Sequence, residues 1–132
     1  MRIGITNLKG GVGKTTISIN LAVCFAHMGY RVCIVDTDTN QSSLKWYGAR
    51  DESLPEVLAI GATDAKALNK AVDKLHKDHD IIIIDGTPSL SETTIPQIEI
   101  CNKHKPNPQA CKEQKAAGSS FWQLERHYPQ KK

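Results

Sequence analysis

The sequence predicts one α/β domain with a mostly parallel sheet and helices on both of its faces. Two observations lead to this prediction. Short apolar segments at residues 3–6, 31–35 and 81–84 have the continuous hydrophobicity of strands that are buried on both faces. Between them, residues 17–28 and 65–77 carry apolar side chains at helical spacing. Alternating strands and helices are typical of α/β proteins, and 132 residues suffice for one such domain but not for two.

A glycine-rich stretch, N-L-K-G-G-V-G-K-T-T from Asn7 to Thr16, joins the first strand to the first helix. Glycines allow backbone conformations that are closed to other residues, so successive N–H groups can converge on one anion at the start of a helix. In such a loop Lys14 reaches the β- and γ-phosphates of a nucleotide, and the Thr15 hydroxyl is placed for Mg²⁺. We therefore expect a nucleotide-binding loop made of Lys9, Gly10, Gly11, Val12, Gly13, Lys14, Thr15 and Thr16.

The helix that follows this loop has an apolar stripe of Ile17, Leu21, Phe25 and Met28. The second strand then ends in Asp36-Thr37-Asp38. Carboxylates at the carboxyl end of a parallel strand lie where open α/β sheets bind ligands, beside the phosphate loop. A competing interpretation is that this acidic strand end only caps the next helix, which we expect from Ser42 through Trp46. The aromatic pair Trp46 and Tyr47 is expected to belong to the core.

Residues 56–60 are expected to form an edge or third strand, and Asp64 is expected to cap a helix from Ala65 to about Lys77. The apolar stripe of this helix consists of Ala65, Leu68, Val72 and Leu75, with lysines on its solvent face. Four consecutive isoleucines, from Ile81 to Ile84, then end in Asp85. A strand of this kind is buried on both faces and delivers a carboxylate at its tip, where Asp85 would hold Mg²⁺ through a water molecule.

The run K-G-G-V-G-K-T-T resembles the deviant Walker A box of the ParA/MinD family of ATPases. Leu8 stands where the common pattern G-x-x-x-x-G-K-[ST] has its first glycine, and Lys9 is the additional lysine of the deviant form. The resemblance continues through D-T-D, the isoleucine strand and the loop after it, to about residue 95. It implies Mg²⁺-dependent hydrolysis of ATP, in which Asp38 orients the attacking water and Asp36, with Thr15 and Asp85, supports Mg²⁺.

The resemblance further implies that Lys9 reaches across an ATP-dependent homodimer to the phosphates of the partner. The family couples this cycle to plasmid or chromosome partitioning, with a ParB-like centromere-binding partner and non-specific DNA, in the cytoplasm. Four scattered cysteines also suggest reduced thiols, and the longest apolar run, from Leu21 to Ala26, has six residues, so no membrane span is expected. Alternatives are a MinD-like cell-division ATPase and a non-catalytic nucleotide-binding fragment. An iron-protein-type reductase is disfavoured because Cys101 and Cys111 are poor cluster ligands.

The last third of the chain departs from the family pattern. A helix could begin at Thr93, but Pro96 is expected to interrupt it, and no apolar periodicity follows Cys101. Residues 101–132 hold seven Lys or Arg against two Asp or Glu, whereas residues 1–100 hold ten against twelve. We therefore expect residues 1–100 to form the N-terminal portion of an ATPase, truncated relative to the family, and residues 101–132 to form a basic, poorly ordered tail.

Overall fold

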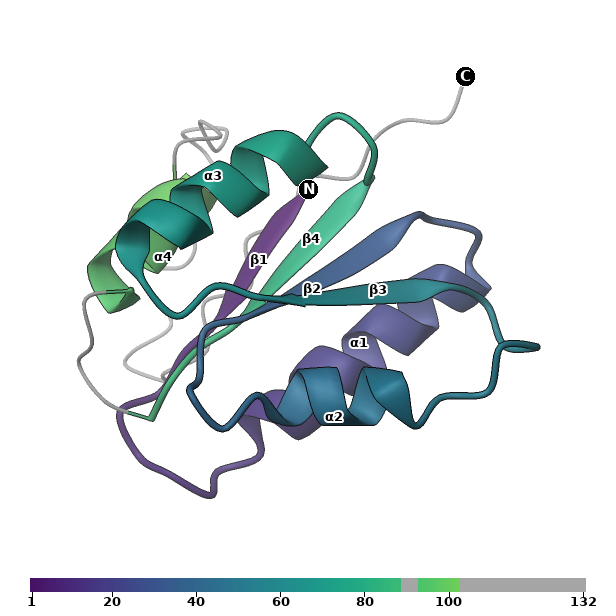
Figure 1. Cartoon of the computed structure of the whole chain (residues 1–132), viewed down its shortest axis with the longest axis horizontal. Helices are drawn as coiled ribbons and strands as arrows, with labels where there is room; N and C mark the ends of the chain where they lie inside the picture. The colour runs from purple at the N-terminus through teal and green to yellow at the C-terminus, as the bar shows by residue number, and fades with distance from the viewer. Residues whose placement is uncertain (89–92, 103–132) are drawn as a thin grey trace, which may run out of the picture.

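The structure is a computed structural model in which residues 1–88 and 93–102 are described. Its centre is one sheet of four parallel strands, β1 (Arg2–Ile5), β2 (Val32–Asp36), β3 (Val57–Gly61) and β4 (Ile81–Asp85). The strands lie in the order β1-β4-β2-β3 (Figure 1). The sheet confirms the predicted fold class and places β3 at an edge.

In the part of the chain that the structure describes, four helices cover the sheet: α1 (Lys14–His27), α2 (Ser42–Gly48), α3 (Ala65–Leu75) and α4 (Thr94–Asn102). Helices α1 and α2 lie on one face, and α3 and α4 lie on the other (Figure 1). The pleat of β4 divides its isoleucines between two cores, because successive side chains point to opposite faces. Ile81 and Ile83 join the core under α1 and α2, while Ile82 and Ile84 join the core under α3 and α4.

Helix α1 packs on the sheet through a face that differs from the predicted stripe. Its buried residues beyond Lys14 are the small ones, Ser18, Ala22 and Ala26. Ile17, Leu21 and Phe25 flank this face, half-buried and packed against the core, but Met28 is 57% exposed. The inclusion of Met28 was wrong. Small side chains at the centre of the contact allow the helix to approach the sheet closely, so the larger ones fill its margins.

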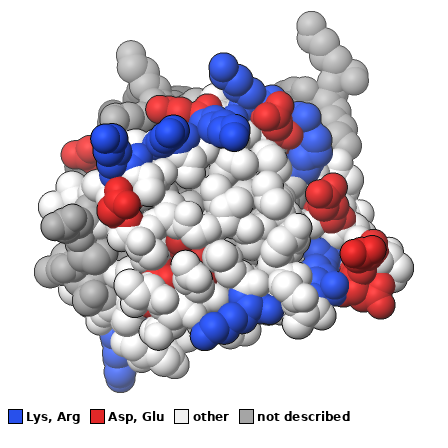
Figure 2. Space-filling view, in the orientation of Figure 1, with Lys and Arg blue, Asp and Glu red and all other residues white. Residues whose placement is uncertain are grey.

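Helix α3 follows its prediction more closely. Asp64 caps it, accepting a hydrogen bond from the Ala67 N–H at 2.8 Å. Leu68, Val72 and Leu75 are buried. The exposed side of the helix carries lysines, which lie along the upper rim of the face shown in Figure 2. They are Lys66, Lys70 and Lys74 within the helix and Lys77 just after it.

The aromatic pair of α2 divides between core and surface. Trp46 packs against the core and lies under Arg50, whose guanidinium carbon is 5.2 Å from the ring centroid. Tyr47 is 38% exposed, so the core prediction was correct only for Trp46.

Helix α4 corrects the expectation for Pro96. The proline is the third residue of a continuous helix and does not interrupt it. The first four N–H groups of a helix have no partner within the helix, so a proline in the first turn removes no hydrogen bond. The boundary expected near residue 100 falls inside α4, and the expected tail beyond Asn102 lies outside the described residues. None of the described helices has the length and hydrophobicity needed to cross a membrane.

Candidate functional site

The glycine-rich loop connects the end of β1 to the start of α1, and α1 begins at Lys14 as the loop pattern requires. Gly13, the residue before the helix, has φ 83°, and Gly11 has φ 71°, both in the left-handed region that favours glycine. Asn7 shapes the start of the loop, since its Oδ1 accepts the Lys9 N–H at 2.9 Å. Sequence reasoning had given Asn7 no role.

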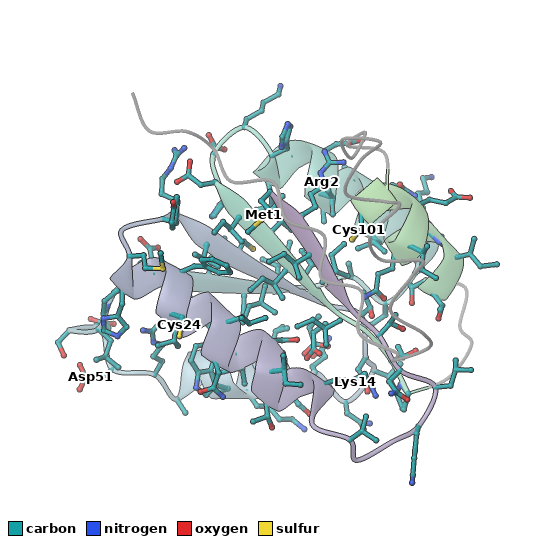
Figure 3. The ribbon with its side chains drawn as sticks, turned by 180° about the vertical axis from the view of Figure 1, so that it is seen from behind. Met1, Arg2, Lys14, Cys24, Asp51 and Cys101 are labelled. Atoms are coloured by element: carbon teal, nitrogen blue, oxygen red, sulfur yellow. The ribbon has the colours of Figure 1, made fainter. Side chains whose placement is uncertain are left out.

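Lys14 lies at the end of the sheet opposite Met1, as Figure 3 shows from behind. Its side chain is 7% exposed, and Nζ donates a hydrogen bond to the Lys9 carbonyl at 3.2 Å. Lys9 is itself exposed, as are Gly10, Gly11 and Thr16, while Thr15 is half-buried. The ammonium of Lys14 is therefore held against the backbone of the loop, and the side chain of Lys9 is exposed to solvent.

A cavity of about 410 Å³ opens over this loop. It is lined by Gly10, Gly11, Val12, Gly13, Lys14, Thr15 and Thr16, together with Asp38, Asn40, Gly86 and Pro88. Apart from Lys9, all the predicted loop residues therefore face one space, together with the carboxylate expected to orient water. Asp38 is half-buried, and its Oδ1 accepts the Asn40 N–H at 3.0 Å. Sequence reasoning missed Asn40.

The two other predicted carboxylates lie side by side. Asp36 and Asp85 are register partners at the ends of β2 and β4, and they are 0% and 1% exposed. Asp36 follows Ile34 by two positions, and Asp85 follows Ile83 by two. Both isoleucines belong to the core under α1 and α2, so the alternation of side chains along a strand turns both carboxylates toward that face. The two carboxylates that the sequence places at strand ends thus lie next to each other at the carboxyl end of the sheet.

Two serines hold Asp85. Its Oδ1 accepts the hydroxyl of Ser18 in α1 at 2.9 Å, and its Oδ2 accepts the hydroxyl of Ser43 in α2 at 2.7 Å. The carbonyl of Asp85 accepts both the N–H of Thr37, at 3.0 Å, and its hydroxyl, at 2.9 Å. These three residues were not identified from the sequence. Only Ser18 left a signal there, because it follows Lys14 by four residues and so lies on the same face of the helix.

Asp36 is held by backbone amides. Oδ1 accepts the Asp38 N–H at 3.0 Å, and Oδ2 accepts the Ser43 N–H in the first turn of α2 at 2.8 Å. Burial raises the pKa of Asp36, the amides of Asp38 and Ser43 oppose this, and the nearby carboxylates of Asp85 and Asp38 add to the rise. Asp36 therefore does cap α2, as the competing interpretation predicted, through its bond to the Ser43 N–H. It also lies beside Asp85.

The donor set fits Mg²⁺. The groups at these strand ends are carboxylates and hydroxyls, the hard oxygen ligands that this ion prefers. Asp38 and Gly86, which closely follow Asp36 and Asp85 in the chain, line the phosphate-loop cavity. Among the described residues, no Lys or Arg forms an ion pair with Asp36 or Asp85. Thr15, Asp36 and Asp85 are the residues that would hold the ion.

Helix α4 packs against the carboxyl end of the sheet on the face opposite α1 and α2 (Figure 1). The Gln97 side chain is 1% exposed, and its Nε2 donates to the Ile84 carbonyl at 3.0 Å and lies 3.5 Å from the Ile5 carbonyl. It thus bridges the ends of β1 and β4. Gly86 leaves no room for a side chain, since an added Cβ would lie 2.8 Å from the Ile5 carbonyl oxygen and 2.9 Å from Gln97 Oε1.

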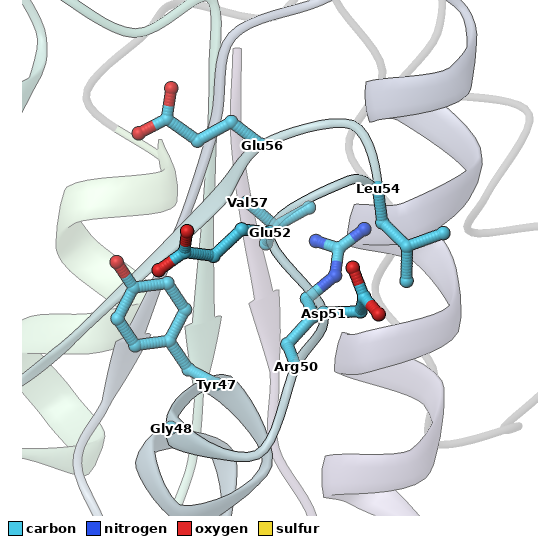
Figure 4. Close-up of a pocket in the computed structure, with 8 residues that line it drawn as sticks. All are labelled: Tyr47, Gly48, Arg50, Asp51, Glu52, Leu54, Glu56 and Val57. Atoms are coloured by element: carbon cyan, nitrogen blue, oxygen red, sulfur yellow. The ribbon is translucent and has the colours of Figure 1, made fainter.

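A second cavity, of about 440 Å³, lies between the end of α2 and the start of β3 (Figure 4). It is lined by Tyr47, Gly48, Arg50, Asp51, Glu52, Leu54, Glu56 and Val57. Three of these residues are acidic against one arginine, which disfavours phosphate, and none of the predicted site residues borders it. The phosphate-loop cavity is therefore the candidate site.

Comparison with known proteins bears on the family of the chain and on its fold. The sequence profile described as "CobQ/CobB/MinD/ParA nucleotide binding domain" matches residues 3–113. The chain is 30% identical over 121 residues to the chromosome-partitioning ATPase Soj of Thermus thermophilus, covering 71% of this chain and 49% of that protein. The chain spans about half the length of the curated relatives it matches.

Two solved structures share the fold. The septum site-determining protein MinD of Pyrococcus horikoshii, complexed with Mg-ADP, has a TM-score of 0.61 at 24% identity, covering 74% of this chain and 53% of that chain. The pNOB8 ParA bound to nonspecific DNA has a TM-score of 0.59 at 22% identity, covering 74% of this chain and 50% of that one. At these identities the two neighbours establish the fold.

Proposed function

Because the chain belongs to the CobQ/CobB/MinD/ParA family of nucleotide-binding domains, we propose that it is a ParA-like, Mg²⁺-dependent ATPase that acts in plasmid or chromosome partitioning. The observation that carries this proposal is that the glycine-rich loop and Asp38 line one cavity at the carboxyl end of the sheet, where Asp36 and Asp85 are register partners. Catalysis in such sites rests on positioning and on stabilising developing charge.

The residues of the site have separate tasks in this proposal. Lys14 and the backbone amides from Gly11 to Thr16 bind the phosphates. Asp38, which lines the cavity with one oxygen held by Asn40, accepts a hydrogen bond from the attacking water and orients it. Thr15, Asp36 and Asp85 would hold Mg²⁺, whose positive charge would stabilise the charge that develops on the phosphates.

Hydrolysis of ATP tests this assignment. The chain should release phosphate from ATP in the presence of Mg²⁺, and Asp38→Ala should retain ATP affinity within about threefold while losing at least about 99% of turnover. Asp73→Ala, an exposed carboxylate on α3, is the matched control and should leave both unchanged. Equal losses of affinity and turnover in Asp38→Ala would instead place Asp38 among the ligands of Mg²⁺.

The homodimer is the second part of the proposal. Lys9 is exposed at the rim of the loop, where it can reach the phosphates of a second copy. Lys9→Ala should bind ATP as a monomer, but sedimentation with a non-hydrolysable ATP analogue should show no dimer. Lys66→Ala is the matched control. A Lys9→Ala dimer with full turnover would contradict the role of Lys9 in trans.

Partitioning is proposed over cell division because the relative Soj is named a chromosome-partitioning ATPase and the neighbour ParA is bound to nonspecific DNA. The proposed partners are non-specific DNA and a ParB-like centromere-binding protein in the cytoplasm. Stimulation of hydrolysis by DNA would support this role. Stimulation by anionic lipid vesicles, with no effect of DNA, would favour the MinD-like alternative.

A non-catalytic nucleotide-binding role is the second candidate. It is favoured by one observation, that the matching family profile is described as a nucleotide-binding domain, and binding alone does not require hydrolysis. Binding of ADP and ATP by the chain, with no phosphate release above background under any of these conditions, would select this candidate over the ATPase.

A further inference from the structure

Ser43 joins the two buried carboxylates of the site. Its backbone N–H donates to Asp36 Oδ2 at 2.8 Å, and its hydroxyl donates to Asp85 Oδ2 at 2.7 Å. Its side chain is 0% exposed, so bulk water does not compete for either bond. Among the described residues, Ser43 is the only one that forms hydrogen bonds with both carboxylates.

Ser18 completes the arrangement from the opposite side. Its hydroxyl lies 2.9 Å from Asp85 Oδ1 and 3.1 Å from the Lys14 carbonyl, so its single proton is shared between two acceptors. Both oxygens of Asp85 are therefore held, one from α1 and one from α2. This fixes the plane of the carboxylate, which would otherwise rotate about its Cβ–Cγ bond.

The donors at Asp85 are neutral, and this has a chemical consequence. A carboxylate offers about four lone-pair sites, of which the two serine hydroxyls use two. No other group among residues 1–88 and 93–102 bonds these two oxygens, so the remaining sites are available to a cation or to the water molecules around it. Hydroxyl donors orient the carboxylate without cancelling its charge, whereas an ammonium or guanidinium in the same place would lower its attraction for a metal ion.

We propose that Ser43 is a positioning residue for metal binding, which sets the orientation of Asp85 relative to Asp36 and so strengthens the coupling between Mg²⁺ and nucleotide. This inference rests on the proposed nucleotide site. Ser43 is the second residue of α2, and Asp38 lies in the segment that leads into that helix. The same residue therefore ties the water-orienting segment to both carboxylates.

The test measures nucleotide affinity with and without the metal. Fluorescent ADP is titrated onto the full chain in excess Mg²⁺ and in EDTA, and the ratio of the two dissociation constants gives the coupling. Ser43→Ala removes the bond to Asp85 but keeps the backbone bond to Asp36. The coupling ratio should fall about tenfold, as for other residues that orient metal ligands, while affinity in EDTA should stay within twofold.

Ser42→Ala is the matched control, because Ser42 is the preceding residue of the same helix and is exposed. It should keep the coupling ratio of the unsubstituted chain. Ser43→Cys is measured in parallel, since it keeps the side-chain volume but replaces the hydroxyl with a weak donor. It should lower the ratio in the same direction, so the test stands even where Ser43→Ala fails to fold.

Two outcomes would overturn the inference while leaving the nucleotide site intact. One is an unchanged coupling ratio in a folded Ser43 variant. The other is an equal loss of affinity in Mg²⁺ and in EDTA, which would show that Ser43 only maintains the fold. Failure of the unsubstituted chain to bind ADP in either buffer would overturn the proposed function, and this inference with it.

Discussion

At the amino end of the sheet, β2 and β4 are preceded by Arg31 and Asp80, which form an exposed pair. The guanidinium Nη2 and Nε lie 3.2 and 3.3 Å from the two carboxylate oxygens, and the Arg31 N–H adds a third bond at 2.9 Å. At the carboxyl end, the same two strands finish in Asp36 and Asp85, which are buried and bonded by neutral amides and hydroxyls.

The difference separates a carboxylate that is paired within the described chain from two that are not. Asp80 has its counter-charge built into the chain, and the Arg31 side chain holds the pKa of Asp80 below its usual range. Asp36 and Asp85 lie next to each other without an ion pair among the described residues. A buried charge without a counter-ion costs free energy, and a cation bound at this end of the sheet, as we propose for Mg²⁺, would lower that cost.

The largest effect is expected for Lys14→Ala, which removes the buried ammonium of the carboxyl end. Charge-assisted bonds to phosphate in a partly dry cavity are among the strongest polar contacts, so affinity for ATP should fall about a hundredfold or more. Isothermal titration calorimetry would measure this loss, with the exposed Lys70→Ala as control. Unchanged affinity would mean that the phosphates do not bind at this end of the sheet.

Gly86→Ala tests how tightly the carboxyl end is built. The new methyl group would meet the Ile5 carbonyl oxygen at 2.8 Å and Gln97 Oε1 at 2.9 Å, so we expect a loss of about 1–3 kcal/mol in the free energy of unfolding. Gly48→Ala is the matched control, because an added Cβ there meets nothing within 4 Å. It should be neutral or stabilising by up to about 1 kcal/mol. Urea denaturation would compare the two, and equal losses would contradict the packing.

Asp85→Asn and Asp80→Asn should change stability in opposite directions. Asparagine at position 85 removes a buried charge, and both serine hydroxyls can reorient to its amide. The ligand-free chain should therefore melt a few degrees higher, with the Mg²⁺ dependence of nucleotide binding lost. Asp80→Asn should melt slightly lower and keep that dependence. Thermal melts and nucleotide titrations of both variants would test this. Changes of the same sign in the two melting temperatures would contradict the difference between the two ends of the sheet.

The smallest effect concerns pH at the amino end. The folded-state pKa of Asp80 is lowered, so its contribution to stability is present above the unfolded pKa of about 4 and is lost as pH falls through the folded value. The difference in melting temperature between the unsubstituted chain and Asp80→Asn should therefore be a few degrees at most at pH 7 and should shrink progressively as pH falls below about 4. A difference that did not shrink over this acidic range would contradict the role of the Arg31–Asp80 pair.

Strand ends and loop chemistry were readable from the sequence because each is set by neighbouring residues. The isoleucine run placed Asp85 at a strand tip, and the spacing of glycines placed Lys14 at a helix start. Contacts between elements were not readable. Ser43 bonds Asp85 at the end of β4, and Gln97 bonds the carbonyl of Ile84 in the same strand. These hydrogen bonds depend on how the helices dock on the sheet. Pro96 misled for a related reason, since its effect depends on where its helix begins.

The packing of α1 has a consequence for which substitutions this protein can accept. Hydropathy would rank Met28 above Ser18, Ala22 and Ala26 as a residue to preserve. The contact with the sheet reverses this order, because the small residues are the buried ones and Met28 is mostly exposed. In a saturation library of this helix, we expect Met28 to be replaced freely by polar residues. Positions 22 and 26 should admit little beyond glycine, alanine and serine.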